Sequence, residues 1–346
     1  MAFPRIFTQT ALIGLVLTMT GCASFRNTDP YPKTQASASV VVDHETTPGM
    51  SELPTGTYSV PKTRLVVSGH QAGTTASMAF GLVGVLVGHV INSERGKSAV
   101  GDASALESYD LASETERLLR EGMTNGGSLK MAKADDTVNS GARMTVVPYG
   151  VLSFIDDTRV RPYIVLRTTL RDDAGKEVWS TRYVAAAADV HPLAGEDGWL
   201  RDGAAPLKQA IGATLKRGVD VMLLDVAGRN QRETKRQIYV GGNYAFLKQP
   251  IKLRGTVVED EPEYIAFAPK IGDVMTFSGV NIFERNSVEI SAATEQDPNF
   301  QVFEPKKTET ASVAAPAAPT AAVAPATQEV AAAPVVTNAA TPAVTK

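Results

Sequence analysis

The stretch RPYIVLRTTLRDDAGKEVWSTRYVAAA, residues 161–187, decides the fold. In its first eleven residues, apolar side chains alternate in the two-residue period of a β-strand, with Ile164 and Leu166 on one face. The DDAGK sequence at 172–176 predicts a tight turn, because Asp and Gly tolerate the backbone angles that a reversal requires. A second strand follows at 177–187 and carries its aromatic side chains on one side. The stretch therefore predicts an antiparallel hairpin with one face suited to a core.

Elements on either side of this hairpin complete an α/β domain over residues 62–229. Strands are expected at 63–68 and 142–154, and amphipathic helices at 105–123 and 207–226. In the second helix, apolar residues recur at steps of three and four and form one stripe that packs against a sheet: Leu207, Ile211, Leu215, Val219 and Met222. The expected fold class is α/β (α+β), with a mixed or antiparallel sheet, helices packed on it, a small β-rich C-terminal unit and disordered tails.

The order of these elements and the hairpin phrase LRDDAGKEVWST, residues 170–181, resemble a known group of domains. The group is the α/β domain of several envelope lipoproteins, including the curli secretion channel, and the N-terminal domain of TolB. The resemblance covers about residues 62–229. It implies an α/β fold in a protein of the cell envelope, and no functional residue is carried over from it.

Residues 230–304 form a second, β-rich unit. The segments YIAFAP at 264–269 and DVMTFSGVNIF at 273–283 carry β-branched and aromatic residues typical of strands. The charged sequence EDEPE at 259–263 predicts a turn between strands. The unit is either a separate small domain, which we favour slightly, or an extension of the first sheet.

The N-terminus has the pattern of a lipoprotein signal peptide over residues 1–21. One cation, Arg5, precedes the uncharged run ALIGLVLTM at 11–19, which has the length of a signal-peptide core and is too short for a membrane span. The run ends in MTGC, which resembles the bacterial lipobox, with Met19 in place of the usual leucine. Cys22 is the only cysteine, so an internal disulfide is excluded. The resemblance implies lipidation of Cys22 and a mature chain that starts there.

The residue after the cysteine bears on which membrane holds the anchor. Ala23 is not the Asp that lipoproteins of enteric type use for retention in the inner membrane. The resemblance therefore implies a protein of the outer membrane that faces the periplasm and is held by acyl chains such as palmitate. Several acyl chains anchor a protein stably, because each buried methylene contributes about 0.8 kcal/mol. The alternative is an ordinary secretory signal in which Cys22 is incidental.

Two segments of biased composition flank the folded body. Residues 22–61 are rich in Thr, Ser and Pro and contain one short apolar run at 40–42, which predicts a flexible tether. Residues 305–346 are mostly Ala, Pro, Val and Thr, and their repeated prolines prevent a continuous helix. This composition predicts a disordered tail. It would be a flexible spacer, or an arm that binds a partner or reaches the cell wall.

The uncharged run AFGLVGVLVGHVI at 79–91 resembles a membrane segment at first sight. Extended to about sixteen residues, it measures ~24 Å as a helix, which is short of a hydrocarbon core of ~30 Å. In a helix, four small residues would form one stripe that permits close backbone approach: Ser77, Gly81, Gly84 and Gly88. We favour a packing seam within the α/β body; an oligomer contact and membrane insertion are the alternatives.

The sequence offers little chemistry. The Asp pairs at 156–157 and 172–173 adjoin turn-like sequence, which indicates solvated turns rather than an acid/base site. No G-x-S-x-G or G-x-x-x-x-G-K-[ST] motif occurs. Net charge is −3, with cations spread along the chain, so no basic stripe indicates nucleic acid. The histidines lack metal-site spacing: His44, His70, His89 and His191. We therefore expect no catalytic, cofactor-binding or metal site.

Two functions from different classes follow from these patterns. The first is a non-catalytic, lipid-anchored envelope protein that acts as a binding or assembly factor, with an unidentified envelope protein or cell-wall component as its partner. The second is an oligomeric, ring-forming export or channel subunit, which the resemblance and the small-residue stripe suggest. An envelope hydrolase is a distant third.

Overall fold

The computed structural model describes most of the chain between residues 24 and 303. The described residues are 24–33, 37–46, 53–54, 56–68, 96–98, 100, 104–123, 129–132, 141–273 and 275–303. All of them belong to one unit, Met1–Pro305. The predicted signal peptide at 1–21 and the predicted tail at 305–346 lie outside the described residues.

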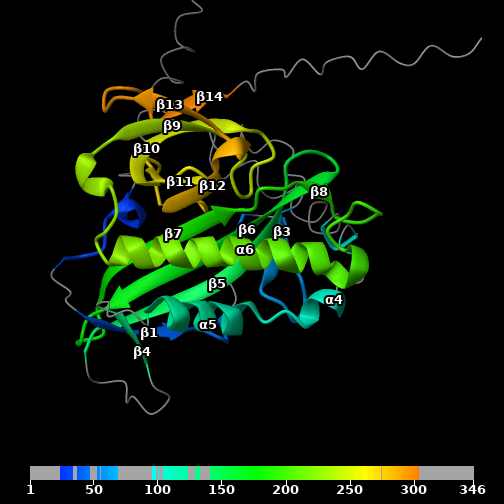
Figure 1. Ribbon diagram of the computed structural model, residues 1–346, viewed down its shortest axis with the longest axis horizontal. Helices are drawn as coiled ribbons and strands as arrows, with labels where there is room; N and C mark the ends of the chain where they lie inside the picture. Colours follow the sequence, from blue (N-terminus) through cyan, green and yellow to red (C-terminus); the bar gives the residue numbers. More distant parts are fainter. Residues whose placement is uncertain are drawn as a thin grey trace, which may run out of the picture. The chain divides into compact units, whose positions relative to one another are not determined.

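Three long antiparallel strands form the centre of the sheet, as the opening stretch predicts (Figure 1). They are β5 (Arg143–Phe154), β6 (Arg159–Arg171) and β7 (Glu177–Ala186). Leu166 of β6 lies opposite Tyr183 of β7. Both connections are tight, and the second reverses at Gly175, whose φ of 78° suits glycine. The predicted hairpin is therefore confirmed.

The strands on one side of β5 come from the segment predicted to be a tether and from the segments that follow it. β5 pairs in parallel with β1 (Ala38–Val42) and β3 (Leu65–Ser68). β4 (Leu129–Met131) pairs with β1, and β2 (Thr57–Ser59) pairs with β3. The prediction of a flexible tether over residues 22–61 is thus wrong at β1 and β2. Three consecutive valines suffice for β1, because it lies between two strands and buries alternate side chains.

On the other side, β7 pairs in parallel with β12 (Val280–Glu284). The sheet continues through β11 (Tyr264–Pro269), β10 (Ile251–Asp260), β9 (Gln237–Gly242) and β13 (Glu289–Ala293). β14 (Phe300–Val302) pairs with β10. The β-rich region is therefore joined to the central strands in one sheet of 14 strands.

β12 begins later than the strand expected at 273–283. A turn brings the N–H of Ser278 to the carbonyl of Met275 (2.9 Å) before the strand starts. Gly279 follows with a φ of 125°, and a Cβ there would lie 2.2 Å from the carbonyl oxygen of Arg182. Only glycine fits this close approach to β7, so the glycine ends the turn and starts the strand.

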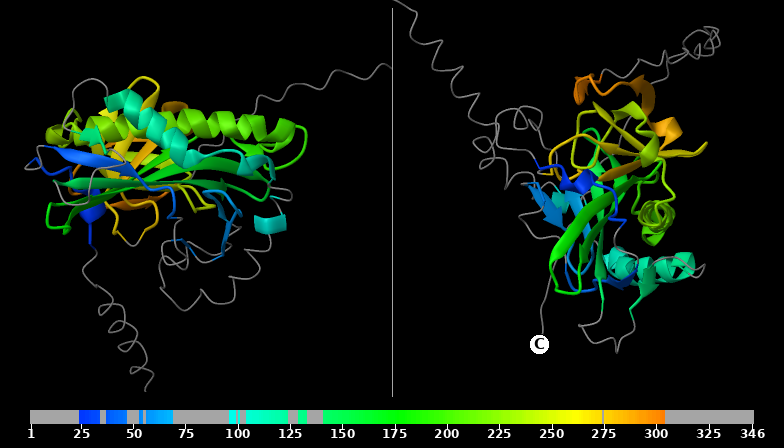
Figure 2. Two further views of the ribbon diagram at one scale, coloured as in Figure 1. Left: turned by 90° about the horizontal axis from the view of Figure 1, so that it is seen from below. Right: turned by 90° about the vertical axis from the view of Figure 1, so that its left-hand side faces the viewer.

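The helices cover one face of the sheet (Figure 2). The long helix α6 (Arg201–Val226) buries the whole predicted stripe against β6 and β7. The single helix expected at 105–123 is instead two helices, α4 (Ser104–Glu107) and α5 (Leu111–Met123). They are separated at Asp110, whose carboxylate accepts the N–H groups of Ala112 and Ser113 and so starts α5.

None of the described helices is both long enough and apolar enough to span a membrane.

A second core lies on the opposite face of the central strands. Tyr163 and Val165 of β6 point into it, together with aromatic side chains from the β-rich region such as Tyr244, Phe267 and Phe283. Ile164 and Leu166 point into the helix-covered core. Both faces of β6 are therefore buried here, whereas the sequence predicts one. The β-rich strands provide the second cover.

Candidate functional site

The residues singled out in the sequence lie outside the described part of the chain. They are the lipidation site, Cys22, and the small-residue stripe Ser77, Gly81, Gly84 and Gly88. The lipidation and seam therefore stay predictions. The described chain begins at Ser24, two positions after Cys22.

Residues 24–33, which we call the docked segment, lie beside β7. The segment opens with a 3₁₀ turn, η1 (Arg26–Thr28), drawn in dark blue in Figure 1. β12 pairs with β7 only at Tyr183–Ala185, and the docked segment binds the part of β7 before it. The indole Nε1 of Trp179 donates to the carbonyl of Asp29 (3.0 Å), and the hydroxyl of Thr181 donates to the carbonyl of Asn27.

A loop before β12 holds the start of the docked segment. The carboxylate of Asp273 accepts the N–H groups of Arg26 (2.9 Å) and Asn27 (3.0 Å). The N–H of Asp273 in turn donates to the carbonyl of Ser24 (2.8 Å). The side-chain amide of Asn27 donates to the hydroxyl of Ser278 (2.9 Å). The two residues that begin η1 are therefore fixed to a loop about 250 positions away.

A buried ion pair lies behind the docked segment. Asp225, at the end of α6, is 1% exposed, and its carboxylate faces Nε and Nη2 of Arg232 at 2.8 and 2.9 Å. It also accepts the hydroxyl of Tyr183 (2.9 Å) and the amide of Asn230 (2.6 Å). The remaining Nη1 of Arg232 donates to the carbonyl of Thr28 (2.9 Å), so the ion pair is connected directly to the docked segment.

The charges of this cluster are set by burial and by each other. Burial raises the pKa of Tyr183 well above its usual value, and the neighbouring Asp225 carboxylate adds to the rise. Burial by itself would lower the pKa of Arg232, but the Asp225 carboxylate outweighs it and raises that pKa. Arg232 stays charged and Tyr183 stays a hydroxyl donor at neutral pH. The cluster therefore clamps the docked segment onto β7 with a charged Arg232 and a neutral Tyr183 hydroxyl.

Aromatic packing completes the attachment. The rings of Tyr31 and Trp179 meet edge to face, with centroids 5.2 Å apart, and both side chains are buried. The sequence places Trp179 on one face of its strand, but it does not indicate that Tyr31 packs there. The only signal that could have found the docked segment is the presence of two aromatic residues, Phe25 and Tyr31, in an otherwise polar stretch.

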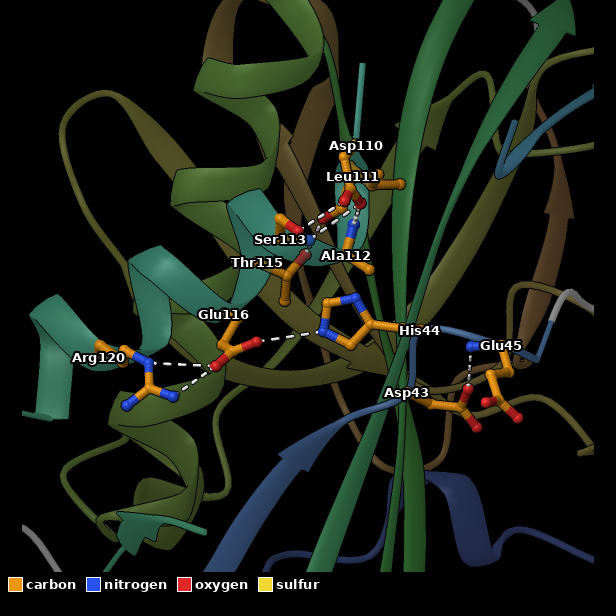
Figure 3. A network of polar contacts seen from close by, with 10 residues as sticks. All are labelled: Asp43, His44, Glu45, Asp110, Leu111, Ala112, Ser113, Thr115, Glu116 and Arg120. Carbon is orange, nitrogen blue, oxygen red and sulfur yellow. Dashed lines mark hydrogen bonds and ion pairs between the residues drawn. The ribbon is translucent and has the colours of Figure 1, made fainter. Parts of the chain in front are cut away.

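A second polar network connects β1 to α5 (Figure 3). Nε2 of His44 lies 3.1 Å from the carboxylate of Glu116, which also binds Arg120. The two hydroxyls in the network are engaged elsewhere: Ser113 donates to Asp110, and Thr115 donates to a carbonyl of its own helix. The network fixes the helix start and its strand, and it does not assemble a nucleophile with the histidine.

The remaining candidates for chemistry occupy structural positions. Asp156 accepts the N–H groups of Thr158 and Arg159 in the β5–β6 turn, and Asp172 accepts that of Lys176 in the next turn. The predicted turn roles of both Asp pairs are thus supported. His191 packs edge-on against Trp199, and His70 and His89 lie outside the described residues. Within the described part of the chain, no group of three His, Cys, Asp or Glu side chains could hold a metal ion.

Comparison with known proteins assigns no family to the chain. No protein-family model matches it, and no curated protein matches its sequence.

Proposed function

We propose that the protein is a lipid-anchored envelope protein whose body acts as a binding or assembly factor. Cys22 would carry the acyl chains, in the outer membrane and facing the periplasm. The support from the sequence is the signal-peptide pattern at 1–21, the lipobox-like MTGC, and a single cysteine placed where a lipoprotein requires it.

The observation that carries the proposal is the docked segment. The described residues begin two positions after Cys22, and residues 24–33 are held by the buried pair Asp225–Arg232 and by Asp273. A mature chain cut before Cys22 would keep every one of these contacts. Removal of a signal peptide that ends at residue 21 is therefore compatible with the fold.

The polar side chains described above have structural roles. Asp225, Arg232 and Asp273 bind the docked segment, while His44 and Glu116 connect a strand to a helix. These polar groups fix the fold, which favours a role in binding or assembly over a reaction.

Acyl labelling of Cys22 tests the anchor. Cells that express the full chain are fed radiolabelled palmitate, and the protein is captured and its label counted. We expect label on the natural chain and none on Cys22→Ser. The matched control is Ala23→Asp, which leaves the cysteine in place; we expect it to keep the label and move to the inner membrane in an enteric host. Label that persists on Cys22→Ser would refute the proposal.

Crosslinking in intact cells, followed by partner identification, tests the binding role. We expect an envelope protein or cell-wall fragment crosslinked to the body. The ring-forming alternative depends on the stripe Ser77, Gly81, Gly84 and Gly88. Size measurement in detergent decides it, because a monomer or dimer is incompatible with a ring.

A further inference from the structure

Exposed apolar side chains occur on the docked segment and on the part of β7 that it binds. In the described part of the chain, three large hydrophobic residues are exposed: Phe25 (39%), Val178 (44%) and Phe300 (47%). Phe25 belongs to the docked segment, and Val178 precedes Trp179, whose indole binds that segment. Two of the three therefore lie where the chain would leave its lipid anchor.

Val178 lines one hollow between the docked segment and β7, and Phe25 precedes Arg26, which lines the same hollow. Its lining is formed by Arg26, Asp29 and the four residues 177–180 of β7. Val178 and Arg26 contribute to the same hollow, so the start of the docked segment and the first four residues of β7 form a continuous surface. We call this surface, together with the exposed Phe25 next to Arg26 in the chain, the anchor face.

Chain length limits how far the anchor face lies from an acylated Cys22. A residue spans at most ~3.6 Å, so the Cα atom of Ser24 lies within about 7 Å of that of Cys22, and that of Phe25 within about 11 Å. The polar layer of a leaflet is about 5–8 Å thick, from a total bilayer of ~40–45 Å and a core of ~30 Å. An acyl chain on Cys22 would therefore hold Phe25 at or next to this polar layer.

We infer that the anchor face rests on the bilayer, with Phe25 and Val178 at the boundary between headgroups and acyl chains. The inference rests on the proposed lipidation of Cys22. Chain reach leaves at most about 11 Å between the Cα atoms of Cys22 and Phe25, which is no more than the diameter of one helix with its side chains, about 10–12 Å, so a folded domain does not fit between them. The occupant of this surface is a lipid layer, and partners bind elsewhere on the body.

A fluorescent reporter on the anchor face tests the inference. Acylation consumes the thiol of Cys22, so Val178→Cys supplies the only free thiol in the lipidated full chain. The thiol is labelled with the environment-sensitive fluorophore NBD, and the protein is reconstituted into phosphatidylethanolamine–phosphatidylglycerol vesicles that contain lipids with a nitroxide near the headgroup. The matched control is Phe300→Cys, a residue of β14 with nearly the same exposure.

We expect a blue-shifted emission at position 178 and at least twofold stronger quenching there than at position 300. Equal quenching at both positions, or none at 178 in protein that floats with the vesicles, would overturn the inference and leave the anchor proposal standing. Protein that carries no acyl label and does not float would overturn both. If Val178→Cys does not fold, Glu177→Cys reports from the same hollow, because Glu177 is exposed and lines it.

Discussion

Replacing Asp225 by Asn removes the charge at the centre of the clamp and keeps the shape of the side chain. The carboxylate accepts four hydrogen bonds, from Tyr183, Asn230 and two nitrogens of Arg232. An amide offers one acceptor oxygen and one donor NH₂ group, so at least one of these donors would face another donor. Arg232, whose side chain is 10% exposed, would stay buried without a counter-charge.

We expect this substitution to lower the free energy of unfolding by about 3–5 kcal/mol, the usual cost of removing one partner of a buried ion pair. That loss is a large part of the ~5–15 kcal/mol that stabilises a typical protein. With a urea m-value of about 2–3 kcal/mol/M, the midpoint of unfolding should fall by about 1–2.5 M. Part of the effect should reach Thr28, because the guanidinium that donates to its carbonyl is the one left unpaired.

Urea unfolding at pH 7, followed by tryptophan fluorescence, measures the loss. The matched control is Asp220→Asn, the same change on the same helix. Asp220 is 52% exposed and pairs with Lys216 at the surface, so we expect a change within about 0.5 kcal/mol. The double variant Asp225→Asn, Arg232→Met should lose less free energy of unfolding than the sum of the losses in the two single variants. A loss below about 1 kcal/mol for Asp225→Asn, or one equal to the control, would refute the reasoning.

Substitutions at three further positions probe smaller features. Burial raises the pKa of Glu259 from 4.5, so the charged form costs stability as pH rises above that value; Glu259→Gln should stabilise the protein at pH 7 but not at pH 4, in urea unfolding at both. Asp110→Ala removes the cap of α5 and should lower the free energy of unfolding by about 1 kcal/mol in the same assay. Asp110→Asn should keep most of that stability, because Asn is also a strong N-cap residue. Burial alone would raise the pKa of Asp156, but hydrogen bonds from backbone N–H groups lower it to about 2. In urea unfolding, the natural protein should therefore be more stable than Asp156→Ala by the full amount above pH 3.8, and this difference in the free energy of unfolding should disappear towards pH 2.

Local patterns predicted the centre of the fold. β6 and β7 follow from side-chain alternation and from an Asp-Gly turn, and α6 follows from an apolar stripe at helical spacing. Each of these signals lies within about 25 consecutive residues. The signal for the break between α4 and α5 is local too, because Asp110 is a strong N-cap residue. The longer apolar pattern around it obscured this signal.

What the sequence did not predict depends on distant partners. β1 looks like part of a tether because it has only five residues, and its stability comes from pairing with β5, where Ser39 meets Arg143. The docked segment is held largely through its backbone carbonyls, which accept from Trp179 and Arg232. Backbone acceptors are the same in every residue, so no local pattern in residues 24–33 can reveal them.

The docked segment links the proposed anchor to the stability of the sheet. β12 covers β7 only at Tyr183–Ala185, and the earlier part of that strand binds residues 24–33 instead of another strand. An uncovered strand edge pairs readily with other chains, so release of the segment would favour aggregation. The contacts that keep the proposed anchor within about 7 Å of the body are thus the contacts that protect β7. A body with this construction cannot swing freely from the proposed anchor without exposing the edge of β7.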